Sequence, residues 1–148
     1  MTFEFSGWRD DAAWQQRLAD DQASLAAQLS DDQRQVLGEI ADIVGAGDSG
    51  DVLALDFMVV FGSSARGQQR PDSDVDIYFE ANLPEPLNRV DAGRHYQVFG
   101  MPRGTLAEEL REGRDFGRDI VANALVVHDT GSFRRLLIFV DEGRTSAL

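Results

Sequence analysis

The spacing of hydrophobic residues in the first third of the chain predicts two helices. Within residues 8–29, apolar side chains recur at the spacing of an amphipathic helix, at Trp14, Leu18, Leu25 and Leu29. Ser30 and the two aspartates that follow it are typical of a helix N-terminus, and a second helix is expected to run to about residue 44. The glycine-bearing stretch 45–50 then ends that helix. Residues 1–51 are therefore expected to form a helical pair.

From residue 52 the pattern changes to short apolar runs separated by turn residues. Residues 55–61 form an apolar run bounded by glycine, which is typical of a strand buried on both faces. Two more strands are expected at residues 75–79 and 94–99, with a proline-bearing connection between them. The remaining expected elements are helices at 105–111, 115–122 and 132–140, and a short apolar segment at 125–128 that ends in a turn at His128 and Asp129. Thr105 and Glu108 have the spacing of a capping box at the start of the first of these helices.

These elements predict an α+β (mixed α/β) fold, in which helices flank one small mixed β-sheet. The length of 148 residues suits a single domain, spanning residues 1–148. Within it, residues 1–51 are the helical segment and residues 52–148 are the expected catalytic-type core.

The composition limits the expected cellular compartment, the kinds of site and the classes of partner. The chain contains no cysteine, which excludes disulfides, thiolate metal sites and cysteine nucleophiles. It lacks both a signal-peptide pattern and an apolar run of the roughly 20 residues that would span a membrane, so a cytoplasmic protein is expected. The net charge of −12 argues against nucleic acid as a groove-bound ligand and favours a cationic substrate or partner.

Asp74 and Asp76 are candidate metal ligands. They lie two residues apart at the start of an expected strand, so both side chains project from one face with their Cα atoms roughly 6–7 Å apart. Neighbouring carboxylates repel each other unless a cation, an arginine or water offsets their charge. Magnesium prefers oxygen ligands, and a pair of carboxylates can bridge two such ions.

The turn before these aspartates has the residue types of a phosphate site. Gly62 follows a buried strand, where glycine permits a backbone conformation and a close approach that other residues forbid. Ser63 and Ser64 supply hydroxyls, and the amides after Gly62 can begin a short helix, whose N-terminus binds phosphate. Arg66 and Arg70 add positive charge of the kind that pairs with phosphate oxygens. Together with the aspartates, this pattern predicts a nucleoside triphosphate held beside metal.

The string Gly62-Ser63, ten further residues and then Asp74-Val75-Asp76 resembles the signature of the DNA polymerase beta-type nucleotidyltransferase superfamily. It is similar to the minimal, stand-alone bacterial members, closely over residues 61–77 and more loosely over about 52–140. The resemblance implies a nucleotidyltransferase-like fold and transfer of a nucleoside monophosphate, such as AMP from ATP, to an acceptor hydroxyl with Mg²⁺ or Mn²⁺. It also implies that Gly62 and Ser63 hold the triphosphate and that Asp74 and Asp76 bind the metal.

Members of this superfamily usually carry a third carboxylate on the next core strand, and the resemblance places Gln97 at that position. A glutamine amide oxygen can bind magnesium, but it cannot serve as the base for an acceptor hydroxyl. Three explanations stay open. The strand alignment is shifted and Glu80 or Asp91 is the third carboxylate; His95, two residues before Gln97 on the same face, supplies an accessory base or ligand; or the site binds nucleotide with reduced or lost catalysis.

Two acceptor classes follow from the resemblance. Minimal nucleotidyltransferases of toxin–antitoxin pairs act as the antitoxin by attaching AMP to a partner toxin, and larger relatives adenylate aminoglycosides, whose positive charge would suit an acidic chain. The absence of a separate helical acceptor-binding domain after the core favours a protein acceptor, or a partner that supplies the missing surface. A catalytically weakened or inactive module that binds nucleotide or a partner is the rival prediction.

Overall fold

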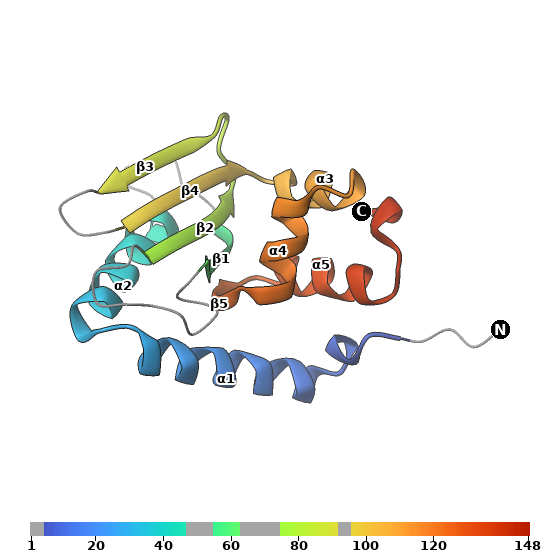
Figure 1. The fold of residues 1–148 in the computed structure, drawn as a ribbon, viewed down its shortest axis with the longest axis horizontal. Coiled ribbons are helices and arrows are strands. Elements are labelled where there is room, and N and C mark those ends of the chain that lie inside the picture. The colour runs from blue at the N-terminus through green and yellow to red at the C-terminus, as the bar shows by residue number, and fades with distance from the viewer. Residues whose placement is uncertain (1–4, 47–54, 63–74, 92–95) are drawn as a thin grey trace.

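The computed structural model describes residues 5–46, 55–62, 75–91 and 96–148. They form an α+β fold around a mixed five-stranded sheet with the strand order β3-β4-β2-β1-β5, as the sequence predicted (Figure 1). The strands are β1 (Leu55–Phe61), β2 (Val75–Ala81), β3 (Leu87–Asp91), β4 (Tyr96–Pro102) and β5 (Leu125–Asp129). β2 and β4 are parallel, and the other neighbours are antiparallel.

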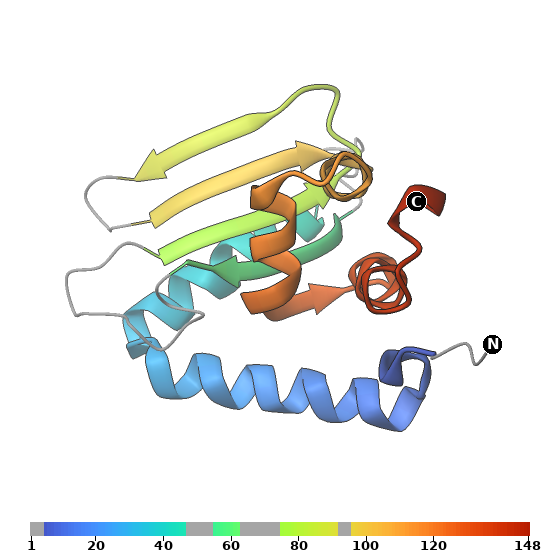
Figure 2. The same ribbon diagram turned by 45° about the vertical axis from the view of Figure 1, so that its right-hand side comes forward.

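Helices cover both faces of this sheet. The helices are α1 (Asp11–Gln28), α2 (Asp31–Ala46), α3 (Thr105–Arg111), α4 (Asp115–Asn123) and α5 (Ser132–Asp141), with short 3-10 helices at Gly7–Arg9 and Thr145–Ala147. Figure 2 shows α2 behind the sheet and α4 in front of it, while α3 and α5 lie where β4 and β5 end. α1 runs beside the edge strand β5, where it packs against that strand. In the part of the chain that the structure describes, no helix is long and apolar enough to cross a membrane.

The predicted helical pair of the first third is confirmed. Trp14, Leu25 and Leu29 are buried, as the helical spacing requires. At the start of α2, the Gln33 amide donates to Ser30 Oγ at 3.2 Å and the Ser30 amide donates to Gln33 Oε1 at 2.9 Å. This reciprocal pair of hydrogen bonds is a capping box, which explains why the chain turns into α2 at Ser30.

The strand register sets out three rows of side chains on the face that α3, α4 and α5 cover. Residues two apart on a strand share a face, and paired residues on neighbouring strands lie side by side. In the order β1, β2, β4, the outer row is Phe61, Asp76 and Gln97, the middle row is Val59, Tyr78 and Phe99, and the inner row is Phe57, Glu80 and Met101. The outer row lies where β1 ends and β2 and β4 begin.

The structure adds one strand that the sequence did not predict. Residues 87–91, for which no element was expected, form the edge strand β3, which pairs antiparallel with β4. Its sequence alternates too weakly to signal a strand, and Leu87 is 48% exposed. The third core strand, described from Tyr96, ends later than predicted, at Pro102, and the predicted residues 94 and 95 lie outside the described part of the chain.

The predicted capping box at Thr105 and Glu108 is wrong. Thr105 is the first residue of α3, and its hydroxyl donates to the Pro102 carbonyl at 2.6 Å. Gly104, in the left-handed conformation, is the N-cap residue instead. At α5 the N-terminal amides are held by Asp129, whose carboxylate accepts from the Phe133 amide at 2.9 Å, so Asp129 has the structural role in a strand-end turn that the sequence predicted.

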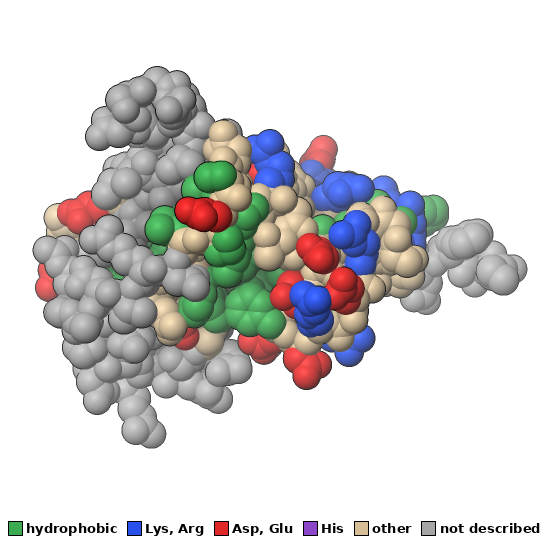
Figure 3. Space-filling view, turned by 90° about the horizontal axis from the view of Figure 1, so that it is seen from above, with side chains coloured by type: hydrophobic (Ala, Val, Ile, Leu, Met, Phe, Trp, Pro, Cys, Tyr) green, Lys and Arg blue, Asp and Glu red, His purple; other side chains and the backbone are tan. Residues whose placement is uncertain are grey.

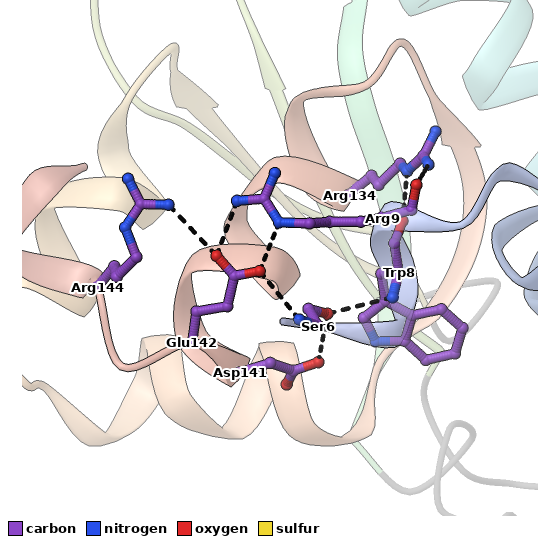
Figure 4. Close-up of polar contacts among 7 residues, drawn as sticks. All are labelled: Ser6, Trp8, Arg9, Arg134, Asp141, Glu142 and Arg144. Carbon is purple, nitrogen blue, oxygen red and sulfur yellow. Dashed lines mark hydrogen bonds and ion pairs between the residues drawn. The ribbon is translucent and has the colours of Figure 1, made fainter. Parts of the chain in front are cut away.

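Polar contacts join the N-terminal segment to the end of α5 (Figure 4). The buried carboxylate of Glu142 accepts from the Ser6 amide at 2.9 Å and from Arg9 Nε at 2.5 Å and Nη2 at 2.7 Å. On the other side of this joint, Arg134 Nε donates to the Trp8 carbonyl at 2.7 Å. Residues 6–9 are therefore fixed to the C-terminal part of the fold before α1 begins.

Candidate functional site

Gly62 and Asp76 lie against each other at the outer row. Phe61 pairs with Asp76 in the antiparallel register, and Gly62 follows in the left-handed conformation with φ 73°. A Cβ atom on residue 62 would overlap Asp76 Oδ2. Both properties that the sequence analysis required of Gly62, the unusual conformation and the close approach, are therefore present, and the group that approaches it is the Asp76 carboxylate.

Gln97 is the neighbour of Asp76 on the opposite side. The parallel register of β2 and β4 pairs the two residues, and both are partly exposed. Asp76 consequently lies between Gly62, which directly follows β1, and Gln97 on β4. This register places Gln97 where the resemblance puts the third carboxylate.

Glu80 forms hydrogen bonds at the start of α3 and does not belong to the outer row. It projects from the same face as Asp76 but from the inner row, and it is 3% exposed. Its Oε1 accepts from the Gly104 amide at 2.9 Å, and its Oε2 accepts from the Leu106 amide at 2.7 Å and the Tyr78 hydroxyl at 2.8 Å. Both oxygens hold the start of α3, so Glu80 does not supply the missing carboxylate.

The pKa values of Glu80 and Tyr78 are shifted because both side chains are buried. Burial raises the pKa of Glu80, while the hydrogen bonds from Leu106, Tyr78 and Gly104 act in the opposite direction. Burial also raises the pKa of Tyr78, and the neighbouring carboxylate of Glu80 raises it further. Tyr78 is thus a neutral hydroxyl that donates to Glu80, and the pair has a structural role.

Several predicted site residues lie outside the described part of the chain. These are Ser63, Ser64, Arg66, Arg70, Asp74 and His95. Asp91 pairs with Tyr96 in the register of β3, and its side chain also lies outside the description. The roles assigned to all of them stay predictions.

The described residues supply oxygen donors for a divalent cation but not a complete site. Among them, no group of three or more His, Cys, Asp or Glu side chains could hold a metal ion, so Asp76 would need Asp74 or a ligand oxygen to complete a site. The Asp76 carboxylate and the Gln97 amide both present oxygen, the donor that Mg²⁺ and Mn²⁺ prefer. Because Gly62 lacks a side chain, the Asp76 carboxylate reaches the backbone where a phosphate is expected.

An aromatic cluster adjoins the outer row, and sequence reasoning missed it. The ring of Phe61 lies 5.8 Å from that of Phe99 and 5.8 Å from that of Phe116, between centroids. Phe116 comes from the first turn of α4 and also lies 5.9 Å from Tyr78. It falls one helical turn before the buried Ile120, so helical periodicity alone does not distinguish it from a core residue.

A cavity of about 380 Å³ at the inner end of the same face is a weaker candidate for the site. Its lining includes Asp56, Glu80, Arg103 and Ser132. Both carboxylates there are already bound, because Arg103 Nε is 2.5 Å from Asp56 Oδ2 and Glu80 accepts hydrogen bonds from α3. The outer row, with its carboxylate against a glycine backbone, is the better candidate.

A mixed sheet that brings an aspartate of one strand against a glycine turn of its neighbour is the architecture of a nucleotidyltransferase-like fold. Residues 51–122 match the family model of the nucleotidyltransferase domain. This part of the chain therefore belongs to the nucleotidyltransferase domain family, as its resemblance to the DNA polymerase beta-type superfamily predicted. The match extends from before β1 into α4 and so includes the outer row. A search of curated proteins gives no match to the chain.

Proposed function

We propose that the chain transfers AMP from ATP to a hydroxyl group of a partner protein, with Mg²⁺ or Mn²⁺ as the cofactor. The observation that carries the proposal is the contact between the Asp76 carboxylate and the backbone of Gly62. Nucleotidyl transfer needs a metal-binding carboxylate next to a phosphate-binding turn, and this contact joins the two. General nucleotidyl transfer agrees with the family match.

The reaction assigns a role to each side of Asp76. The acceptor oxygen attacks the α-phosphorus, the bond between this phosphorus and the β-phosphate oxygen breaks, and pyrophosphate leaves. The metal, held by Asp76 and the predicted ligand Asp74, offsets the negative charge on the phosphate oxygens. Gly62, with Ser63, Ser64, Arg66 and Arg70 as predicted partners, would bind the triphosphate. Since Gln97 cannot accept a proton, the hydroxyl proton passes to water, which favours a slow reaction.

A protein acceptor is supported by how the C-terminal helices pack. In the described part of the chain, α3, α4 and α5 all contribute side chains to the core of the sheet, among them Leu106, Ile120 and Phe133. They do not build a separate lobe around an acceptor, so a partner would have to bring its own surface to the outer row. The resemblance suggests a toxin as this partner and the chain as its antitoxin, and ATP would place the reaction in the cytoplasm.

The second candidate function is a binding module that has lost catalysis. Gln97 favours it, because the register puts an uncharged amide beside Asp76. Such a module would bind nucleotide and a partner without forming a covalent product.

Incubation with labelled ATP and Mg²⁺ tests the enzyme against the module. The acceptors are proteins that co-purify with the chain and, in a separate arm, aminoglycosides. The proposal expects label on the partner protein and its loss in Asp74→Ala/Asp76→Ala. Nucleotide binding without transfer would support the module, and label on the aminoglycoside alone would overturn the protein acceptor.

Two glycine variants make the test specific for the Gly62 contact. Gly62→Ala and Gly143→Ala both place a side chain at a positive φ, 73° and 66°, at a backbone cost of about 1–3 kcal/mol. Only the first also meets Asp76, since nothing lies within 4 Å of a Cβ at residue 143. Transfer and nucleotide binding should be lost in Gly62→Ala and kept in Gly143→Ala. Equal effects would contradict the proposed site.

A further inference from the structure

Phe116 is a large apolar side chain at the edge of the candidate site. It is 40% exposed, whereas Phe57, Phe79 and Phe133 are almost fully buried. Its ring meets that of Phe61 edge-on, with 87° between the ring planes. An aromatic side chain of this size usually buries most of its surface, so the exposed part of this ring beside the outer row is a surface on which a ligand group can pack.

The surface around Phe116 is aromatic rather than merely apolar. Phe61, Phe99 and Phe116, which we call the aromatic platform, come from β1, β4 and α4, and Phe99 is itself partly exposed. Seen from above, hydrophobic side chains gather in the middle of the molecule, while arginine and acidic side chains concentrate toward the C-terminal helices (Figure 3). A planar ligand group that can stack on an aromatic ring therefore suits this surface.

The outer row fixes the direction from which each part of the substrate approaches. In phosphoryl and nucleotidyl transfer, the attacking oxygen and the leaving oxygen lie roughly in line through the phosphorus. On the proposed function, Gly62, which follows β1, lies on the side of the leaving pyrophosphate, and Gln97 on β4 lies on the side of the acceptor. The nucleoside leaves this line sideways, and the described exposed ring on that side along β2 is Phe116.

Along β2, the middle row follows Asp76. Tyr78 lies two residues further on the same face, and the ring of Phe116 lies 5.9 Å from the Tyr78 ring. A two-residue step along a strand is roughly 6–7 Å between Cα atoms, so Phe116 packs on the residue that follows Asp76 on the same face of β2. Phe61, another ring of the platform, is the residue directly before Gly62.

We propose that the aromatic platform stacks the base of the bound nucleotide and that Phe116 is its exposed ring. The inference rests on the proposed function, since it places the nucleoside of the same triphosphate. Stacking is tolerant of base identity but stronger for the larger purines, so the platform favours ATP and GTP over CTP and UTP.

Calorimetric binding of two probes tests this, both with Mg²⁺: ATP, and inorganic tripolyphosphate, which has the phosphates but no base. Phe116→Ala should weaken ATP binding on the order of tenfold to a hundredfold and leave tripolyphosphate binding unchanged. Phe116→Tyr keeps the ring and should retain ATP binding. Phe5→Ala makes the same change at a position that is 73% exposed and distant in sequence, and it should bind both probes like the wild type.

Other outcomes separate the inference from the proposed function. If the folded Phe116→Ala variant binds ATP like the wild type, the platform does not hold the base. If its ATP binding is unchanged but transfer to the partner falls, the ring contacts the acceptor, and the base assignment is overturned. If the wild type binds tripolyphosphate and ATP equally, the phosphate site stands without the platform. If the wild type binds neither probe, the proposed function fails together with the inference.

Discussion

Gln97 is the residue that separates the proposed enzyme from the binding module. It lies beside Asp76 in the register of two parallel strands, where a carboxylate would both strengthen metal binding and accept the proton of the acceptor. An amide there removes one negative charge from the site. It also lowers the repulsion that Asp76 would otherwise meet in the absence of metal.

Gln97→Glu should therefore change how stability depends on metal. Without a divalent cation, the new carboxylate beside Asp76 should lower the melting temperature, because like charges on neighbouring strands destabilise a sheet by about 1 kcal/mol or less. With Mg²⁺, which the pair of carboxylates would bind more tightly, the upward shift of the melting temperature should exceed that of the wild type. The same variant should transfer label faster. Thermal melting in EDTA and in millimolar Mg²⁺ measures the first two effects.

The control for this variant is Gln97→Ala, which removes the amide and adds no charge. It should show no greater shift with Mg²⁺ than the wild type. An equal Mg²⁺ shift in Gln97→Glu and the wild type would mean that Asp76 does not bind metal at this position. That result would count against the proposed function and not only against the role of Gln97.

At the scale of elements, α3 shows how a distant residue begins a helix. The helix has seven residues, too few to be stable alone. Its N-terminal amides are bound by Glu80 of β2, so the helix is anchored to the strand that also carries Asp76. This anchor holds the chain that leads on to α4 and Phe116.

Glu80→Gln should destabilise the fold by about 1–3 kcal/mol. Glu80 accepts from three donors with two oxygens, whereas a glutamine has only one acceptor oxygen. Its NH₂ group would take the place of the other oxygen and would face a donor that then has no acceptor. Glu108→Gln is the matched control, because Glu108 is an exposed residue of the same helix, and the sequence pattern had marked it as the cap. Urea unfolding of both variants measures the difference. Equal losses of stability would contradict the assignment of the cap to Glu80.

This contrast shows what the sequence can and cannot predict. α1, α2, β1, α4 and α5 were predicted nearly to their ends, because periodicity, apolar runs and local caps are properties of neighbouring residues. The cap of α3 and the edge strand β3 depend on partners elsewhere in the fold, Glu80 and β4, and no local pattern announces them. For the site, the need for glycine at residue 62 was predictable from its position after a buried strand. The exposure of Phe116 was not, because its helical position is the same as that of a core residue.

At the scale of the whole molecule, an ion pair and hydrogen bonds join residues 6–9 to the C-terminal end of α5. Glu142 is 4% exposed at its side chain and binds both the Ser6 amide and the guanidinium of Arg9. Arg134 holds the backbone of the same segment from α5. In an acidic chain of net charge −12, this joint places scarce positive charges where they neutralise a buried carboxylate.

The pH dependence of stability should reveal this joint. Bonds from Arg9 and the Ser6 amide lower the pKa of Glu142 from 4.5 to about 2. Because the folded pKa lies below the unfolded one, the stabilisation is present above about pH 4.5 and is lost as the pH falls toward 2. The free energy of unfolding of the wild type should therefore exceed that of Glu142→Gln most at neutral pH, and this excess should shrink in acid. Urea unfolding from pH 7 to about pH 3, with exposed Glu85→Gln as the charge-matched control, measures it. An excess that stays constant over this range would show that the ionised carboxylate does not hold the N-terminal segment in place.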